Sequence, residues 1–329
     1  MFRNISVQKK GLGNFLKRGL GLAAVIMIPL AVPSLEAQTF PNQAVQFIVP
    51  FGAGSGSDLI ARAIQPYAEK TLGNRLIIAN IPGADSRIGM KKLYTAKPDG
   101  LAIEINNFPT AIIHEYLFDV PYRALDFSFI YAWILSPQVI FVSEDSSWKS
   151  FDDFVLEGRK RPLALGLPGI GTTVHLLAMI MAKHMNVKFN YIPYSGSAQG
   201  FAALAGNHID ANVGSADAAL GLVQAKKIRP LIIWSSTPDP NFPDVTLSTK
   251  YNLPTFAPAR GVFGPPNMPE GRVRVLEKAF SQAATHPKLI EWSKSRGYEP
   301  IAWNAKQFRQ EIEKQQSLVR EYKDFLKTP

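Results

Sequence analysis

After the N-terminal region, short apolar runs alternate along the chain with longer stretches in which apolar residues recur every three or four positions. The runs 44–49, 102–105 and 139–142 have the length and apolar content of buried strands. The stretch 58–72 has one apolar face and is followed by Gly73, as expected of an amphipathic helix. Strands that alternate with helices in this way predict an α/β fold with largely parallel sheets.

The same reasoning predicts most of the remaining elements. The further strands expected are 76–79, 163–166, 189–192, 209–213, 228–233 and 261–264. The further helices expected are 88–96, 109–117, those that follow Ser150, Thr173 and Ser197, and 218–225, 270–285 and 305–326. The last of these has an apolar stripe on an otherwise charged surface, so it must pack against the body of the protein.

Two of the expected strands end in turns rich in glycine and hydroxyl-bearing residues. The turn sequences are Gly52-Ala53-Gly54-Ser55-Gly56-Ser57-Asp58 after the first strand and Leu167-Pro168-Gly169-Ile170-Gly171-Thr172-Thr173 after the strand 163–166. Glycines let a ligand approach the backbone, and the N–H groups that begin the following helix favour an anion. Because ligands bind beyond the carboxyl ends of parallel strands, we expect the two turns to face each other across a cleft, one in each domain.

Other chemistries fit these turns less well. The second turn has the glycine spacing of a phosphate-binding P-loop but lacks its lysine, which disfavours nucleotide hydrolysis. None of Ser55, Ser57 and Ser195 stands in the Gly-x-Ser-x-Gly frame of a nucleophile, so an exported serine hydrolase is a weaker alternative. The five histidines show no metal-ligand spacing, and we expect neither a metal nor a cofactor.

A purely structural role for the same residues is also compatible with the sequence. Thr172 or Thr173 can serve as an ordinary helix cap. Asp58 and Arg62 stand four residues apart on one helix and can form an ion pair or hold the first turn. His175 lies in the first turn of its helix and favours packing or loop fixation over a ligand contact.

Residues 1–37 have the layout of a cleavable secretory signal peptide. Basic residues precede an uncharged apolar stretch from Gly19 to about Val32, and a plausible cleavage site follows Ala37. That stretch is short for a membrane span, so an uncleaved anchor is the weaker alternative. The chain of 329 residues has no cysteine, hence no disulfide and no lipid anchor on one, and its charge of +10 falls to about +6 after cleavage. We therefore expect a soluble exported protein, without a basic stripe for nucleic acid.

An ordered set of short motifs runs from about Phe40 to the C-terminus. The motifs are Pro50-Phe51-Gly52-Ala53-Gly54 with Asp58, Asn80, Pro82-Gly83-Ala84, Pro98-Asp99-Gly100, Gly169, Gly171-Thr172 with His175, Pro193-Tyr194, and Gly261-Val262-Phe263-Gly264-Pro265. In this order they resemble the periplasmic substrate-binding proteins of tripartite tricarboxylate transporters, the Bug family.

The resemblance implies a two-lobed α/β clamshell of the type II periplasmic-binding-protein kind, with the ligand in the cleft between the lobes. Lobe one would comprise residues 38–140 with 236–329, and lobe two residues 141–235. The resemblance further implies a monomeric solute receptor rather than an enzyme. It would bind a small carboxylate, such as a di- or tricarboxylate or an aromatic acid, and deliver it to integral-membrane transporter subunits. A receptor that senses its ligand for a signalling partner is the alternative.

The expected ligand contacts are backbone N–H groups and hydroxyls of the two turns. They are Phe51, Gly52, Ala53, Gly54, Ser55, Gly56, Ser57 and Asp58 in lobe one, and Gly169, Gly171, Thr172, Thr173, His175, Ser195 and Ser197 in lobe two. The sequence departs from the family pattern at Gly52, Ser55 and Gly214-Ser215, and Asp85-Ser86-Arg87 stands where Gly-Gly-Asn is usual. The first two departures keep a backbone anion site, whereas the others lie in loops that can rim the cleft and indicate a less common ligand.

Overall fold

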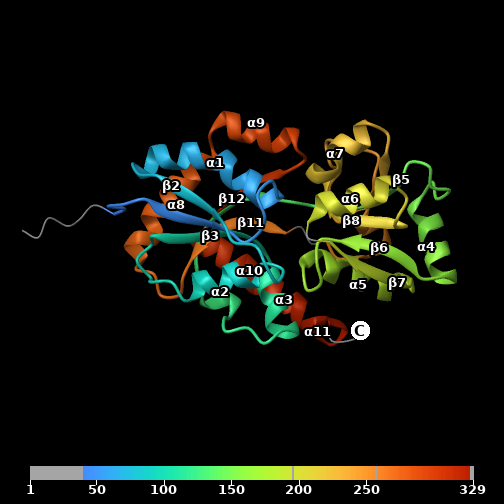
Figure 1. Ribbon diagram of the computed structural model, residues 1–329, viewed down its shortest axis with the longest axis horizontal. Coiled ribbons are helices and arrows are strands. Elements are labelled where there is room, and N and C mark those ends of the chain that lie inside the picture. Colours follow the sequence, from blue (N-terminus) through green and yellow to red (C-terminus); the bar gives the residue numbers. More distant parts are fainter. Residues whose placement is uncertain (1–39, 195, 256–257, 327–329) are drawn as a thin grey trace, which may run out of the picture. The chain divides into compact units, whose positions relative to one another are not determined.

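The computed structural model describes residues 40–194, 196–255 and 258–326 (Figure 1). The expected signal peptide, residues 1–37, and the candidate ligand residue Ser195 lie outside these ranges. No helix in the described ranges has the length and apolar content needed to cross a membrane.

The first of two six-stranded sheets has the order β12-β4-β11-β3-β1-β2. Its strands are β1 (Val45–Val49), β2 (Leu76–Asn80), β3 (Ala102–Phe108), β4 (Ser128–Leu135), β11 (Ala259–Gly264) and β12 (Glu299–Asn304). β1 pairs in parallel with β2 and β3, whereas β11 is antiparallel to both of its neighbours and β12 is antiparallel to β4.

The second sheet has the order β10-β9-β5-β8-β6-β7. Its strands are β5 (Gln138–Ser143), β6 (Leu163–Leu167), β7 (Phe189–Pro193), β8 (Ala211–Ser215), β9 (Ile228–Ile233) and β10 (Thr246–Leu247). Only β5 runs antiparallel to its neighbours. The expectation of largely parallel sheets is therefore wrong in detail: both sheets are mixed. In the first sheet, β11 follows β10 of the second sheet in the chain and is inserted antiparallel between β3 and β4. In the second sheet, β5 follows β4 of the first sheet and is inserted antiparallel between β8 and β9.

Eleven α-helices are present in the described ranges. They are α1 (Gly56–Leu72), α2 (Arg87–Tyr94), α3 (Thr110–Leu117), α4 (Phe151–Lys160), α5 (Thr173–Met185), α6 (Ser197–Ala205), α7 (Ala216–Gln224), α8 (Glu270–Ala284), α9 (Pro287–Ser295), α10 (Ala305–Glu321) and α11 (Lys323–Leu326). The single helix expected over 305–326 is wrong, because it is interrupted at Tyr322, whose N–H bonds to the carbonyl of Val319. The strands β4, β10 and β12 and the helix α9 are additions to the elements expected from the sequence.

Both faces of the first sheet are covered by helices (Figure 1). On one face, Phe47 of β1 meets Phe280 of α8 edge to face, with 5.6 Å between ring centroids. On the other, Phe308 of α10 contacts Phe108 and Phe129 with centroids 5.5 and 5.0 Å apart. The apolar stripe of α10 is thus buried, as the sequence predicts. The carboxyl ends of β1 and β6 carry the two glycine-rich turns.

Candidate functional site

The first glycine-rich turn is held in place by the carboxylate of Asp58, which is buried at the start of α1. The Oδ2 atom accepts from the N–H of Gly54 at 2.9 Å and from Nε of Arg62 at 2.9 Å, and Oδ1 accepts from Nδ2 of Asn80 at 3.0 Å. Although burial alone would raise the pKa of Asp58, these hydrogen bonds lower it. Asp58 therefore stays ionised and serves the loop, which agrees with the structural reading of this residue.

The part of this turn that faces solvent is its backbone. Gly52, Ala53 and Gly54 are exposed, and Gly54 has φ = 79°, which favours glycine. Ser55 caps α1 by accepting from the N–H of Asp58 at 3.3 Å. The other N–H groups of the first helical turn have no intrahelical acceptor and remain available for an anion.

The second turn precedes α5 and is organised by Thr172 and His175. The Thr172 hydroxyl donates to the carbonyl of Gly169 at 2.9 Å and accepts from the N–H of His175 at 3.3 Å. The N–H of Gly171 donates to Nδ1 of His175 at 3.3 Å. Because Nδ1 is an acceptor here, the imidazole is neutral, and burial lowers the pKa of His175 to about 4.

The second turn packs against segments that belong to the first sheet. The buried hydroxyls of Thr173 and Thr110, the first residue of α3, lie 3.3 Å apart. A Cβ atom added to Gly169 would lie 2.3 Å from Oδ1 of Asp85, so this carboxylate lies directly against the glycine. A Cβ atom on Gly171 would lie 2.7 Å from the ring of Phe118. The second turn is thus flanked by residues of α3 and of the loop before α2, from the part of the chain that builds the first sheet.

The structure says less about the remaining expected ligand contacts and about how the two turns relate to each other. Among the described residues, no hydrogen bond or ion pair joins 51–58 directly to 169–175. Ser197 is the first residue of α6 and is partly exposed. The two turns therefore lie at the ends of β1 and β6, where the strand-to-helix reading puts them, but their joint role in one site stays a prediction.

The Asp85-Ser86-Arg87 segment, which departs from the family pattern, lies beside the second turn, and the backbone at its start is strained. Ala84, Asp85 and Ser86 have φ values of 47°, 53° and 77°, three successive non-glycine residues in the left-handed region. Such strain costs about 1–3 kcal/mol per residue and concentrates at ligand clamps. The guanidinium of Arg87 lies 3.5 Å from the ring centroid of Phe118, and its buried Nη1 has no partner. Burial raises the pKa of Asp85, and Arg87 lowers it in part.

Arg260 of β11 is not among the residues that the sequence assigns to the site. Its side chain is buried, and its Nη1 donates to the hydroxyl of Ser57 at 3.2 Å. The signal was available, because a charged residue within an otherwise apolar strand is rare without a partner or a ligand.

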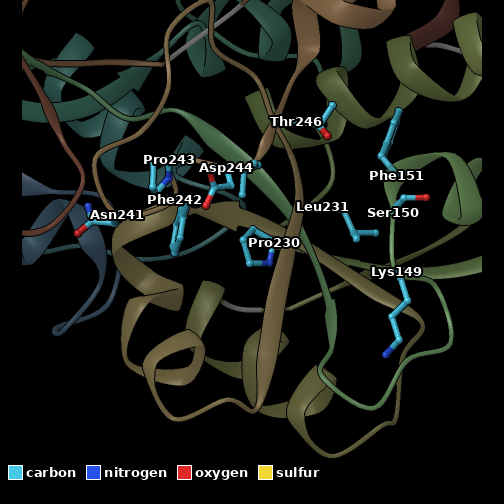
Figure 2. A pocket seen from close by; sticks show the side chains of 11 residues that line it. Lys149, Ser150, Phe151, Pro230, Leu231, Asn241, Phe242, Pro243, Asp244 and Thr246 are labelled. Atoms are coloured by element: carbon cyan, nitrogen blue, oxygen red, sulfur yellow. The ribbon is translucent and has the colours of Figure 1, made fainter.

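Two cavities in the described part of the chain lie away from both turns. One, of about 410 Å³, is lined by residues from around β9, β10 and the start of α4 (Figure 2). Its lining residues are Lys149, Ser150, Phe151, Pro230, Leu231, Asn241, Phe242, Pro243, Asp244, Val245 and Thr246. The other, of about 390 Å³, lies between the β9 end and α10 and includes Trp234, Trp303 and Gln315. Neither contains a residue that the sequence assigns to the ligand. Within the described residues, no three His, Cys, Asp or Glu side chains gather as a metal site would require.

His175 gives the second turn a testable response to acid. Below pH 6.5 the unfolded chain binds a proton at this residue, whereas the folded protein does so only near pH 4. The wild-type protein is therefore expected to lose about 1.4 kcal/mol of unfolding free energy per pH unit over this interval, relative to His175→Gln. Urea unfolding of both proteins at pH 7.5, 6.0 and 5.0 measures the difference. A difference that does not change with pH would contradict the neutral, buried imidazole.

Comparison with known proteins places these features in a family. The family described as the tripartite tricarboxylate transporter family receptor matches residues 60–323. A UPF0065 protein of Bordetella pertussis is 30% identical over 290 residues, which cover 85% of this chain and 88% of that protein. The protein BugT of the same organism is 26% identical over 315 residues, which cover 91% of this chain and 97% of that protein.

Solved structures share the fold. MatC of Rhodopseudomonas palustris, with bound malate, superimposes with a TM-score of 0.78 at 23% identity, over 88% of this chain and 100% of that one. The R. palustris protein Rpa4515, with adipate, gives a TM-score of 0.80 at 22% identity, over 87% and 98% of the two chains. The expected α/β, two-lobed periplasmic-binding-protein fold is confirmed.

Proposed function

Because this chain belongs to the tripartite tricarboxylate transporter receptor family, we propose that it binds a small carboxylate and delivers it to the membrane subunits of such a transporter. The family is one of receptors, and the chain is a solute receptor rather than an enzyme. The observation that supports the carboxylate most directly is the second turn, where two buried threonine hydroxyls and a helix N-terminus are flanked by residues from the part of the chain that builds the first sheet.

In this proposal, lobe one carries the first sheet and lobe two the second, near the expected bounds 38–140 with 236–329 and 141–235. Because β10 pairs with β9 in the second sheet, lobe two extends to about residue 247. The ligand lies between the turns 51–58 and 169–175. Each helix N-terminus contributes about 0.3–1 kcal/mol, and up to about 2 kcal/mol when partly buried. Hydrogen bonds to a charged carboxylate contribute about 1.5–3 kcal/mol each, so they dominate the affinity. Only the closed form contacts the ligand from both lobes, and binding therefore favours closure.

The relatives bound to malate and adipate support a dicarboxylate with its two charges at opposite ends. The protein would act in the periplasm as a monomer after removal of residues 1–37, and its membrane partner would recognise the closed form. The Asp85-Ser86-Arg87 segment, which is unusual in the family, lies against Gly169. We therefore expect a ligand that differs from malate and adipate.

The test is calorimetry of the purified mature protein against a panel of mono-, di- and tricarboxylates that includes malate and adipate. At least one acid is expected to bind with micromolar affinity or better. Native mass spectrometry of the protein as isolated looks for an acid that co-purifies. If no acid binds and none co-purifies, the proposed function is wrong.

Thr172→Ala and Thr173→Ala test the second turn. The Thr172 hydroxyl holds the turn through Gly169 and His175, and the Thr173 hydroxyl lies against Thr110. Each change therefore loosens the turn at which we expect the carboxylate to bind, and affinity for the best-bound acid should fall about tenfold or more. Thr172→Ala also removes the cap of α5 and is expected to cost about 1 kcal/mol of stability. Thr95→Ala, which removes an exposed hydroxyl at the end of α2, is the matched control and should bind like the wild type. Unchanged affinity in both test variants would move the site elsewhere.

A further inference from the structure

Arg260 occupies an unusual position for a charged residue. It lies on β11 between β3 and β4, opposite Asn107 and Ile134, and only 6% of its surface is exposed. Every residue of β11 is buried. Burial of a guanidinium costs several kcal/mol unless a counter-charge and hydrogen bonds compensate for the lost water.

The guanidinium lies at the first turn of α1. Nη1 donates to the Ser57 hydroxyl at 3.2 Å, and a Cβ atom added to Gly56 would lie 3.1 Å from Nη1 and 3.4 Å from Nη2. The N-terminus of a helix carries partial positive charge, so the arginine and the helix repel each other at this point. An anion bound between the guanidinium and the helix N-terminus would offset this repulsion.

No carboxylate of the described part of the protein directly contacts Arg260. Asp217 acts on it only from a distance: its carboxylate accepts from the hydroxyl of Tyr298, on which the charge of Arg260 also acts. No Asp or Glu in the described ranges forms an ion pair with Arg260, and its buried Nε has no hydrogen-bond acceptor. Asp58, the acid of the same turn, already binds Arg62, Gly54 and Asn80. The buried Oδ1 of Asn107, which faces Arg260 across the strand pair, is also without a partner.

We propose that Arg260 binds a carboxylate of the ligand, together with the Ser57 hydroxyl and the free N–H groups at the start of α1. The inference rests on the proposed function and assigns to lobe one a cation that the sequence does not reveal. A guanidinium presents paired donors to a carboxylate in one plane, which an ammonium cannot do. The site thus selects a planar carboxylate at this end.

The test is calorimetry of the mature protein, with malate, adipate and the best-bound acid of the carboxylate panel as probes, on the wild type, Arg260→Gln and Arg260→Lys. We expect Arg260→Gln to lower the affinity about 30- to 100-fold, because a charged hydrogen-bonding pair is lost. Arg260→Lys keeps the positive charge but loses the two coplanar N–H donors of the guanidinium, and should lower the affinity about five- to tenfold.

Arg229→Gln is the matched control. Arg229 of β9 is also partly buried with one unpartnered nitrogen, but its Nη2 donates to the backbone carbonyls of Ser146 and Trp148, and it belongs to the other sheet. This variant should lose stability and keep wild-type affinity. Thermal unfolding of each variant shows which are folded.

The outcomes separate the two proposals. If the wild type binds none of the probes and no other acid of the panel, the proposed function fails. If the wild type binds and folded Arg260→Gln or Arg260→Lys binds as well as the wild type, the role of Arg260 is refuted. The same holds if Arg229→Gln weakens binding as much as Arg260→Gln, because the effect is then structural. If Arg260→Gln does not fold, Arg260→Lys decides the question alone.

Discussion

Replacing Gly169 with alanine is expected to reduce affinity for the best-bound acid by more than tenfold and to destabilise the protein by about 1–3 kcal/mol. Two independent features lead to this result. Gly169 has φ = 133°, a backbone conformation that an L-residue adopts only with strain. In addition, a Cβ atom there would lie 2.3 Å from Oδ1 and 3.0 Å from Cγ of Asp85.

Asp85 cannot relieve this clash cheaply. Its own backbone is in the left-handed region, as are those of both neighbours, so a shift of the segment would add to existing strain. The new methyl group would instead push the second turn away from Asp85 and from the contact between Thr173 and Thr110. Those contacts belong to the arrangement that we expect the ligand to favour.

Gly271→Ala, in α8 and outside both turns, is the matched control for Gly169→Ala. Nothing lies within 4 Å of a Cβ atom added at Gly271, and its φ is not in the positive range. We expect this variant to bind like the wild type and to be no less stable. Calorimetry measures the ligand affinity of both variants, and urea unfolding measures their stability. Equal affinities in Gly169→Ala and the wild type would show that the second turn does not close on the ligand.

Glu104→Gln is expected to stabilise the protein strongly above neutral pH. Glu104 lies on β3 and is fully buried, and burial raises its pKa well above the ordinary value of 4.5, although a hydrogen bond from Asn106 at 3.1 Å opposes this. Its Oε2 has no partner among the described residues. The folded protein therefore holds a neutral carboxylic acid where the unfolded chain has a carboxylate.

The sign follows from the proton balance. Above pH 4.5 the folded state binds a proton that the unfolded state has released, so wild-type stability falls as pH rises until the folded-state pKa is reached. The loss is up to about 1.4 kcal/mol per pH unit. Glutamine keeps an acceptor for Asn106 and has no proton to lose. Unfolding free energies at pH 4, 6 and 8 should show variant and wild type similar at pH 4 and increasingly different above it. A constant difference would refute the neutral carboxylic acid.

Most helices and strands were predictable because their signals are local. Ser150 caps α4 as expected and forms a capping box with Asp153, and Gly73 ends α1 in the left-handed conformation. β4 was missed even though residues 129–135 form a continuous apolar run, as a strand buried on both faces does. β12 offered little to find, because it is a partly exposed edge strand that contains Pro300.

The candidate site was predictable only in part, for a physical reason. Helix caps and glycine turns are specified by neighbours in sequence, so Ser55 and Thr172 appear where expected. The hydrogen bond from Arg260 to Ser57 depends on the insertion of β11 beside β3, and this pairing of distant segments is not specified by neighbouring residues in the sequence. The left-handed backbone of Asp85 likewise contradicts local preference.

The place of β11 also has a consequence for how the protein folds. All strands of the second sheet come from one continuous stretch, 138–247. In the first sheet, β3 and β4 do not pair with each other and are joined only through β11, which begins at residue 259. Pairing between segments that lie far apart in the sequence is slow, because the chain loses conformational entropy before the stabilising contacts form. We therefore expect the second sheet to gain protection from hydrogen exchange first during refolding, and the first sheet to follow as a late, cooperative step.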